Sequence, residues 1–133
     1  MEFIDNASEL EKYTIVHTSR FPKRFTFTLA NEIVGYSREV YNYVSSANRY
    51  PTTIRDYNRR FEMFSLAKEE LEKMVRQLRM ADDIFGIKAN TLRDWMWLIE
   101  REERLINGVI ISDKQMVKFL KSEESKKTSK QVT

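Results

Sequence analysis

Cysteine is absent from this sequence of 133 residues, and histidine, proline and glycine are scarce, with one, two and three residues respectively. Without cysteine the chain can form no disulfide, hold no thiolate-bound metal and offer no thiol nucleophile. The lone histidine, His17, cannot build a histidine zinc site by itself, and three glycines are too few for the common glycine-rich phosphate loops. We therefore expect a protein that is not an enzyme and that binds no metal or cofactor.

Long apolar runs are missing as well. No stretch approaches the roughly 18 apolar residues that cross a bilayer. The first residues, MEFIDNASELEK, are acidic and lack the apolar centre of a secretory signal. We expect a soluble, cytoplasmic protein with no membrane partner.

The residues that are abundant favour helices. Charged residues make up 32% of the chain and hydrophobic residues 41%, a balance typical of long amphipathic helices. Apolar residues recur at spacings of three and four, which is the period of a helix with one buried face. The expected helices run from Ser8 to Thr18, along Leu29 to Ala47 with an end at Pro51, from Thr53 to Phe85, and from Thr91 to Asn107-Gly108.

Short loops between such helices make neighbouring helices antiparallel. The sequence thus predicts an all-α fold, an up-and-down antiparallel four-helix bundle with a short C-terminal extension. The bundle domain covers residues 1–112. Residues 113–133 would hold a short helix to Leu120 and then a basic, disordered tail, because KSEESKKTSKQVT has almost no apolar side chain to bury.

Positive charge is concentrated in two segments. The net charge is −3 over residues 1–19, +5 over 20–60, −2 over 61–112 and +3 over 113–133, which together give the overall +3. Concentrated positive charge is typical of proteins that bind polyanions, because contacts to phosphate drive such binding. A solvated charged helix face is the common alternative for patches of this size.

Seven basic residues near the two predicted turns are the candidate contacts to nucleic acid or to a protein partner. They are Arg20, Lys23 and Arg24 before the second helix, and Arg49, Arg55, Arg59 and Arg60 around the turn to the third. In an up-and-down bundle these two turns lie at opposite ends. The chain therefore carries either two smaller patches or one patch completed by neighbouring subunits. The arginines could equally pair with acids of their own chain.

The acidic residues give no sign of catalysis. Glu100, Glu102 and Glu103 form a cluster, but the cluster alternates with Arg101 and Arg104. At helical spacing Glu100 and Arg104 form an i,i+4 pair, which is typical of a solvated face. We therefore place this cluster on the surface of the fourth helix.

Aromatic residues outside the apolar stripes predict a second buried surface. Trp95 and Trp97 point about 200° apart on a helix, so one of them must face outward. An outward tryptophan, together with Phe25, Phe27 and Tyr41, indicates an interface between subunits of a homo-oligomer.

Three stretches resemble one family of four-helix bundles. They are the Phe21-Pro22-Lys23 step followed by Leu29 and Ile33, LRMADDIFGI from Leu78 to Ile87, and LIEREERLINGVIISDK from Leu98 to Lys114. In this order they are similar to the family that includes the ribosomal-RNA intervening-sequence proteins and the accessory variability determinant proteins of diversity-generating retroelements. The resemblance covers about residues 8–114.

Within this family the chain resembles the retroelement branch more closely. The stretch VSSANRY, Val44 to Tyr50, departs from the Asn-Ile-Ala-Glu-Gly-like sequence of the intervening-sequence branch. The chain also lacks the tryptophan that many retroelement members carry after the glycine turn at Gly108, which is a departure from the favoured branch.

The resemblance implies a homopentamer, a barrel of bundles with a basic surface. Such a protein would bind the element's reverse transcriptase and its template RNA or cDNA, and support mutagenic cDNA synthesis without catalysing it. An intervening-sequence-type bundle oligomer with an unassigned RNA or protein partner is the alternative. A purely structural helix-bundle oligomer is a third possibility.

Overall fold

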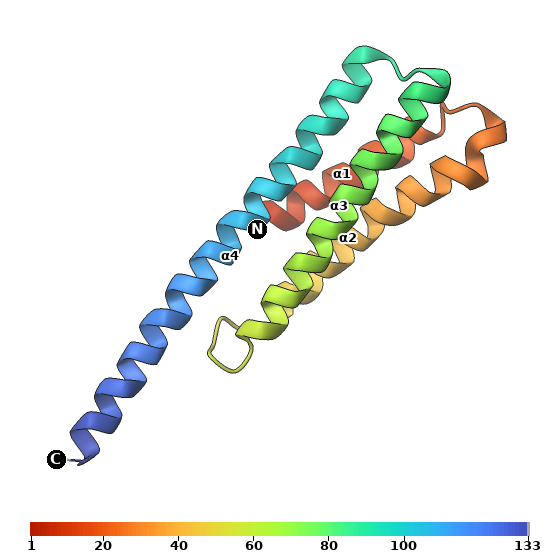
Figure 1. The fold of residues 1–133 in the computed structure, drawn as a ribbon. Helices are drawn as coiled ribbons and strands as arrows, with labels where there is room; N and C mark the ends of the chain where they lie inside the picture. The colour runs from red at the N-terminus through yellow and green to blue at the C-terminus, as the bar shows by residue number, and fades with distance from the viewer. Residues whose placement is uncertain (133) are drawn as a thin grey trace.

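Four α-helices joined by short connections make up the fold in the computed structural model (Figure 1). The structure describes residues 1–132, with the backbone alone for residues 129–132. The helices are α1 (Glu2–Thr18), α2 (Asn31–Arg49), α3 (Tyr57–Phe85) and α4 (Ala89–Val132), and residues 1–132 contain no strand. Consecutive helices run antiparallel and α4 packs against α1, which confirms the predicted up-and-down bundle.

The first helix begins earlier than the sequence predicted. We expected a start at Ser8 because Ser8 and Glu11 fit a capping pattern, but α1 starts at Glu2. Phe3, Asn6 and Ala7 are buried one helical turn before Leu10, so the apolar stripe extends to the N-terminal end of the helix. Packing of this stripe, rather than a side-chain cap, fixes where α1 begins.

The connection from α1 to α2 is itself mostly helical. Pro22 has an extended backbone and interrupts the chain after α1. A 3₁₀ turn, Lys23–Phe25, and a π turn, Thr26–Ala30, then lead directly into α2. The basic residues of this segment are therefore held on ordered backbone.

The fourth helix does not end at Asn107-Gly108, so that sequence prediction was wrong. It continues to Val132, across the expected domain limit at residue 112 and through the segment for which we expected disorder; Thr133 lies outside the described residues. A helical glycine costs only about 1 kcal/mol relative to alanine. Beyond Gly108 the buried side continues with Asp113 and Val117, each 5% exposed, so packing there outweighs the glycine.

The core runs along the axis of the bundle and contains one of the two tryptophans. Trp95 is fully buried, and its Nε1 donates a hydrogen bond to the Thr14 hydroxyl at 3.0 Å. That hydroxyl in turn donates to the Leu10 carbonyl at 2.7 Å, so the polar groups around the indole are paired. Trp97 is 52% exposed, which confirms that only one of the pair faces inward.

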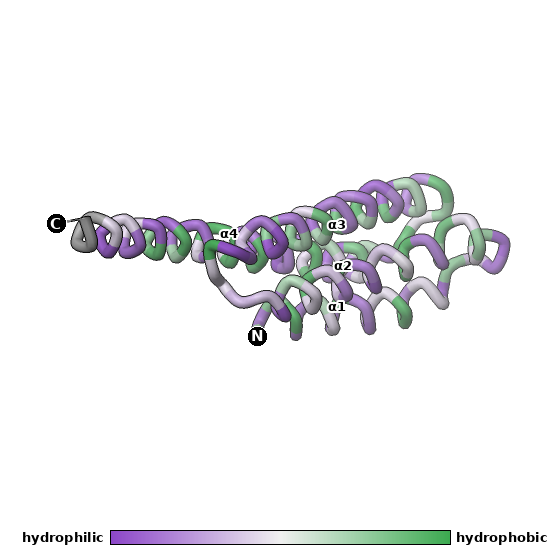
Figure 2. Tube along the Cα trace, turned by 90° about the horizontal axis from the view of Figure 1, so that it is seen from below, coloured by the Kyte–Doolittle hydropathy of each residue, from purple (hydrophilic) through white to green (hydrophobic). Residues whose placement is uncertain are grey.

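The bundle has two ends, and each carries one of the two prolines. The Pro22 end consists of residues 19–30 with the α3–α4 loop, residues 86–88. The Pro51 end consists of the α2–α3 loop, residues 50–56, with α4 from about residue 107 onward. The C-terminal part of α4 extends beyond the other three helices (Figure 1). Figure 2 shows polar and apolar residues interspersed along that part of the helix.

Candidate nucleic-acid interface

Three of the predicted contact arginines are exposed at the Pro51 end. Arg49 closes α2, Arg55 lies in the loop and Arg59 belongs to the first turn of α3. Among the described residues none of the three has an acidic oxygen within 4 Å, although the Arg59 guanidinium lies 5.6 Å from the centre of the Tyr50 ring. Their charge is therefore available to an external anion.

The continuation of α4 brings the second basic segment to the same end. Because α4 is antiparallel to α3, its C-terminal half passes the α2–α3 loop (Figure 1). Arg55 and Ile54 line a shallow groove together with Leu120, Lys127 and two acids of α4, Glu123 and Glu124. The exposed lysines of this half of α4 are Lys114, Lys118, Lys121, Lys126 and Lys127. Two segments that are more than fifty residues apart in sequence thus form one basic region.

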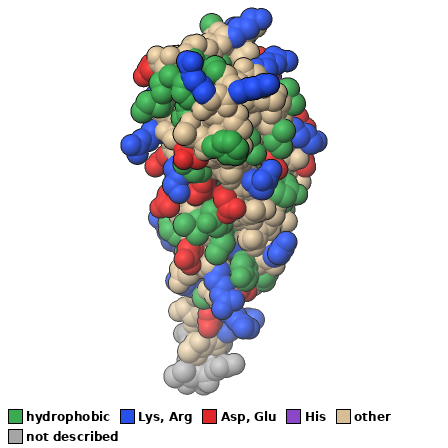
Figure 3. Space-filling view, turned by 90° about the vertical axis from the view of Figure 1, so that its right-hand side faces the viewer, with side chains coloured by type: hydrophobic (Ala, Val, Ile, Leu, Met, Phe, Trp, Pro, Cys, Tyr) green, Lys and Arg blue, Asp and Glu red, His purple; other side chains and the backbone are tan. Residues whose placement is uncertain are grey.

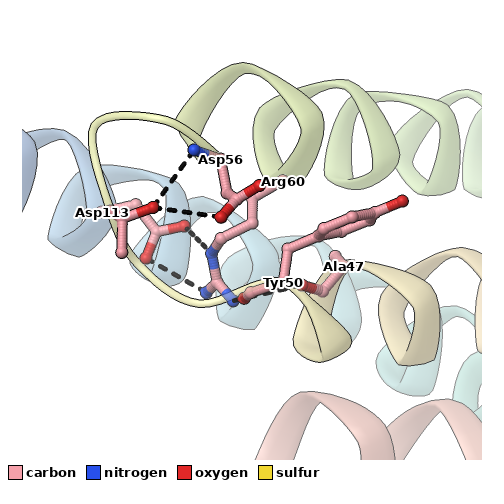
Figure 4. Close-up of polar contacts among 6 residues, drawn as sticks. Ala47, Tyr50, Asp56, Arg60 and Asp113 are labelled. Atoms are coloured by element: carbon pink, nitrogen blue, oxygen red, sulfur yellow. Dashed lines mark hydrogen bonds and ion pairs between the residues drawn. The ribbon is translucent and has the colours of Figure 1, made fainter.

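Arg60 has a different role from the one that the sequence predicted. It is 6% exposed, and its Nε and Nη2 donate to the two carboxylate oxygens of Asp113 at 2.8 and 3.2 Å (Figure 4). Its Nη1 donates to the carbonyls of Tyr50 and Ala47 at 2.7 and 3.1 Å. The side chain is therefore a structural link between α2, α3 and α4, and it is not free for a phosphate.

The loop next to Arg60 is held by a local capping arrangement. The Thr53 hydroxyl accepts the Asp56 N–H at 3.2 Å and donates to the Asp56 carboxylate at 3.2 Å (Figure 4). Asp56 stands immediately before α3, where a negative charge suits the positive end of the helix. The loop that carries Arg55 is thus anchored on both sides, by Arg60 and by this cap.

The Pro22 end carries a second group of basic side chains. Arg20, Lys23 and Arg24 are exposed and none of them forms an ion pair with a described residue. Lys88, from the α3–α4 loop, lines a cavity with Arg20 and adds a cation that the sequence analysis did not single out. Figure 3 shows Lys and Arg side chains along the whole length of one face, interspersed with acidic side chains. The basic residues named here lie at the opposite end of the bundle from Arg49, Arg55 and Arg59.

Aromatic rings close the Pro22 end beneath these cations. Phe21 meets Phe85 edge-on with ring centres 4.8 Å apart, and Phe25 stacks on Phe85 at 5.1 Å. Phe25 is therefore engaged within its own chain, and Tyr41 is likewise half-buried against the core. Of the four predicted interface residues, the structure leaves Phe27 (83% exposed) and Trp97 (52% exposed) accessible to a second molecule.

The predicted acidic surface on α4 contains one buried carboxyl. Glu102 is fully buried between α1 and α4, and its Oε1 accepts a hydrogen bond from Asn6 Nδ2 at 3.2 Å. Burial raises the pKa of the Glu102 carboxyl to about 8, against a smaller lowering effect of Asn6. Glu102 is therefore mostly protonated at neutral pH and is not part of a solvated face, whereas Glu100 and Glu103 are exposed as expected.

Side chains of His, Asp and Glu do not assemble into a metal site in the part of the chain that the structure describes. Among the same residues, none of the helices has both the length and the apolar character to cross a bilayer. No family model, no curated protein and no solved structure matches the chain.

Proposed function

We propose that the chain is a non-catalytic accessory protein of a diversity-generating retroelement, which binds template RNA or cDNA and the element's reverse transcriptase through basic surfaces. The observation that carries the nucleic-acid part is the basic region of the Pro51 end. There, Arg49, Arg55 and Arg59 form no ion pair with a described residue, and α4 brings exposed lysines, together with Glu123 and Glu124, beside the loop. Such a region binds polyanions by displacing the counterions of phosphate groups.

Rigid presentation supports this function. The Arg60–Asp113 pair and the Thr53–Asp56 cap hold the α2–α3 loop in place, so the backbone that carries Arg55 and Arg59 needs no ordering when they meet a phosphate. Arginine also offers a fork of N–H donors that matches two phosphate oxygens at once. The lysines of α4 extend the basic surface as separate point charges along the helix.

The identity of the protein partner is supported by the resemblance of the Phe21-Pro22-Lys23 step and the two later stretches to the retroelement accessory family. The same resemblance supports assembly into a homopentamer, for which Phe27 and Trp97 offer exposed aromatic surface. Size-exclusion chromatography with light scattering is the test of assembly: a clean 16 kDa monomer at micromolar concentration would contradict it.

Salt-dependent binding tests the nucleic-acid part of the proposal. A fluorescent single-stranded RNA is titrated with the protein at several salt concentrations, and the slope of log affinity against log salt is measured. Replacing Arg49, Arg55 and Arg59 together by alanine should reduce that slope by about 2, since each lost phosphate contact removes about 0.7. The affinity at low salt should fall about tenfold or more.

The matched control removes equal charge elsewhere. Arg38, Arg79 and Arg104 are exposed on the sides of the bundle, and their replacement by alanine lowers the net charge by the same amount. This variant should keep most of the affinity and most of the slope. Equal losses in the two variants would mean that only overall charge matters. RNA affinity that is absent at low salt, both alone and after addition of the element's reverse transcriptase, would contradict the proposed function.

A further inference from the structure

The Pro22 end contains a cavity of about 320 Å³ that the proposed function does not use. Its walls come from the last turn of α1, the Pro22 turn, the α3–α4 loop and the first turn of α4. This volume is at the lower limit of pockets that hold small organic ligands.

Two kinds of side chain line this cavity. Phe21 and Phe85 form an aromatic wall, and their rings belong to the cluster that also includes Trp95, whose ring centre is 6.1 Å from that of Phe21. Arg20 and Lys88 come from two different connections, are exposed, and have no ion pair with a described residue. The cavity therefore combines surface for a flat ring with positive charge for an anion.

Polar groups complete the lining. The Nδ1 of His17 is inaccessible to solvent and has no hydrogen-bond partner among the described residues. Burial, followed by the nearby Arg20, lowers the pKa of His17, so the ring is neutral at pH 7 and can accept or donate one hydrogen bond. The Thr91 side chain lines the same cavity.

Acids near the cavity are already engaged. Asp82 accepts the Ile87 N–H at 2.8 Å and so fixes the α3–α4 loop. Asp94 lies 3.4 Å from Arg93, on the next turn of α4. Neither carboxylate pairs with Arg20 or Lys88, so both cations can serve a ligand.

We propose that this cavity binds a single unpaired nucleotide, with the base against Phe21 and Phe85 and the phosphate between Arg20 and Lys88. Thr91, at the cavity wall, would hydrogen-bond the edge of the base. A nucleoside monophosphate and an unpaired nucleotide of a strand share this chemistry. That the nucleotide belongs to a strand of RNA or cDNA rests on the proposed function. That the cavity binds a nucleotide does not rest on it. The consequence is a preference for single-stranded over base-paired nucleic acid, because a paired base cannot enter.

The test compares two single strands of equal length and charge, one with bases and one abasic. Stacking of one base on aromatic side chains should make the strand with bases bind about tenfold more tightly at equal salt. The Arg20→Ala/Lys88→Ala variant should lose most of this difference. The Lys23→Ala/Arg24→Ala variant removes the same charge from the same end outside the cavity lining, and should keep the difference.

A second experiment measures the binding of a free nucleotide. In a Trp97→Phe variant, Trp95 is the sole tryptophan and lies beside Phe21, so its fluorescence reports on the cavity. Adenosine monophosphate should change that signal, and the Arg20→Ala/Lys88→Ala variant in the same background should weaken the change about tenfold or more. Circular dichroism of each variant verifies that the bundle is folded.

The two proposals fail in different ways. Salt-dependent strand binding with no difference between the two strands, and no response of Trp95 to the nucleotide, would overturn the cavity proposal and leave the proposed function standing. A Trp95 response to adenosine monophosphate without any strand binding would support the cavity as a site for a free nucleotide and contradict the proposed function. Equal loss of the base-dependent difference in the two double variants would also overturn the cavity proposal.

Discussion

At the Pro22 end aromatic rings close the bundle, whereas at the Pro51 end an ion pair does so. Phe21, Phe25 and Phe85 cover the first end and leave a cavity under exposed cations. Arg60 and Asp113 close the second end with four hydrogen bonds and leave the loop surface to other arginines. Both ends are basic. We propose that the Pro22 end binds a single nucleotide and that the Pro51 end binds the phosphate backbone of a strand.

The Pro51 end shows that neighbouring arginines can have two separate roles. Arg59 and Arg60 are adjacent in sequence, yet one is exposed and the other is buried. A buried arginine must have its donors paired, and Arg60 donates to the Ala47 carbonyl, which also accepts the Tyr50 N–H, and to the Tyr50 carbonyl just after α2. Only the exposed neighbour remains to bind a partner.

Removing the buried ion pair should have the largest effect on stability. Arg60→Met leaves the Asp113 carboxylate buried without its cation and should lower the free energy of unfolding by about 4 kcal/mol. Arg59→Met, one residue away and exposed, should change it by about 0.5 kcal/mol or less. Urea denaturation measures both. The Arg60→Met/Asp113→Leu double variant should be more stable than Arg60→Met alone. Equal losses of stability in Arg60→Met and Arg59→Met would contradict the structural role of Arg60.

Opening the aromatic end should cost slightly less. Phe21→Ala creates a void beside Phe85 and Trp95 and should lower the free energy of unfolding by about 3 kcal/mol. Phe27→Ala, on the same connection but 83% exposed, should change it by about 0.5 kcal/mol or less. Thermal unfolding followed by circular dichroism compares the two, and a similar loss in both would show that Phe21 does not close this end.

A pH series tests the buried Glu102 carboxyl of α4, which has no cation paired with it. The folded-state pKa of Glu102 is raised to about 8 from an ordinary 4.5, so the stability due to its protonated form is complete below pH 4.5. That stability is lost as the pH rises toward 8. From about pH 5 to about pH 7, Glu102→Gln should gain roughly 2 to 3 kcal/mol relative to the parent protein.

The control for this series is the neighbouring exposed acid. Glu103→Gln should show no such trend with pH when both variants are measured by urea denaturation. A Glu102→Gln difference that stays constant between these two pH values would mean that the carboxyl is ionised in the fold.

A smaller effect on stability than at Arg60 or Phe21 is expected at Trp97. Its ring is half exposed and lies 5.5 Å from the Arg101 guanidinium, so Trp97→Ala should cost about 0.5–1 kcal/mol. The same change should shift the assembly toward smaller species in sedimentation velocity if Trp97 lies between subunits. Unchanged sedimentation would place the interface elsewhere.

The sequence predicted those parts of the molecule that depend on local periodicity. The apolar stripe from Leu29 to Ala47 and the glycine after Phe85 marked the helices that became α2 and α3. The stop at Gly108 failed because the expected turn residues were outweighed by burial of Asp113 and Val117, which depends on helices that are distant in sequence.

The sites were harder to predict because their partners are remote. Asp113 pairs with a residue 53 positions earlier, and Glu102 meets Asn6, 96 positions away. A charged residue among charged neighbours is typical of a solvated face, and no local pattern marks the one that turns inward. The exposed arginines could be proposed from composition alone, whereas the cavity depends on the meeting of two connections that are separated by more than sixty residues.

The continuity of α4 also has a mechanical consequence. The part of the helix after Asp113 is about 28 Å long, at about 1.5 Å per residue. Its first turns lie against the Pro51 end through Val117 and Leu120, and the rest projects from the bundle (Figure 1). A partner that pulls on this projecting arm applies torque about the Arg60–Asp113 pair. Through Arg60 that load reaches the carbonyls of Ala47 and Tyr50, at the end of α2. The C-terminal arm is thus a lever whose fulcrum lies beside the loop that presents Arg55.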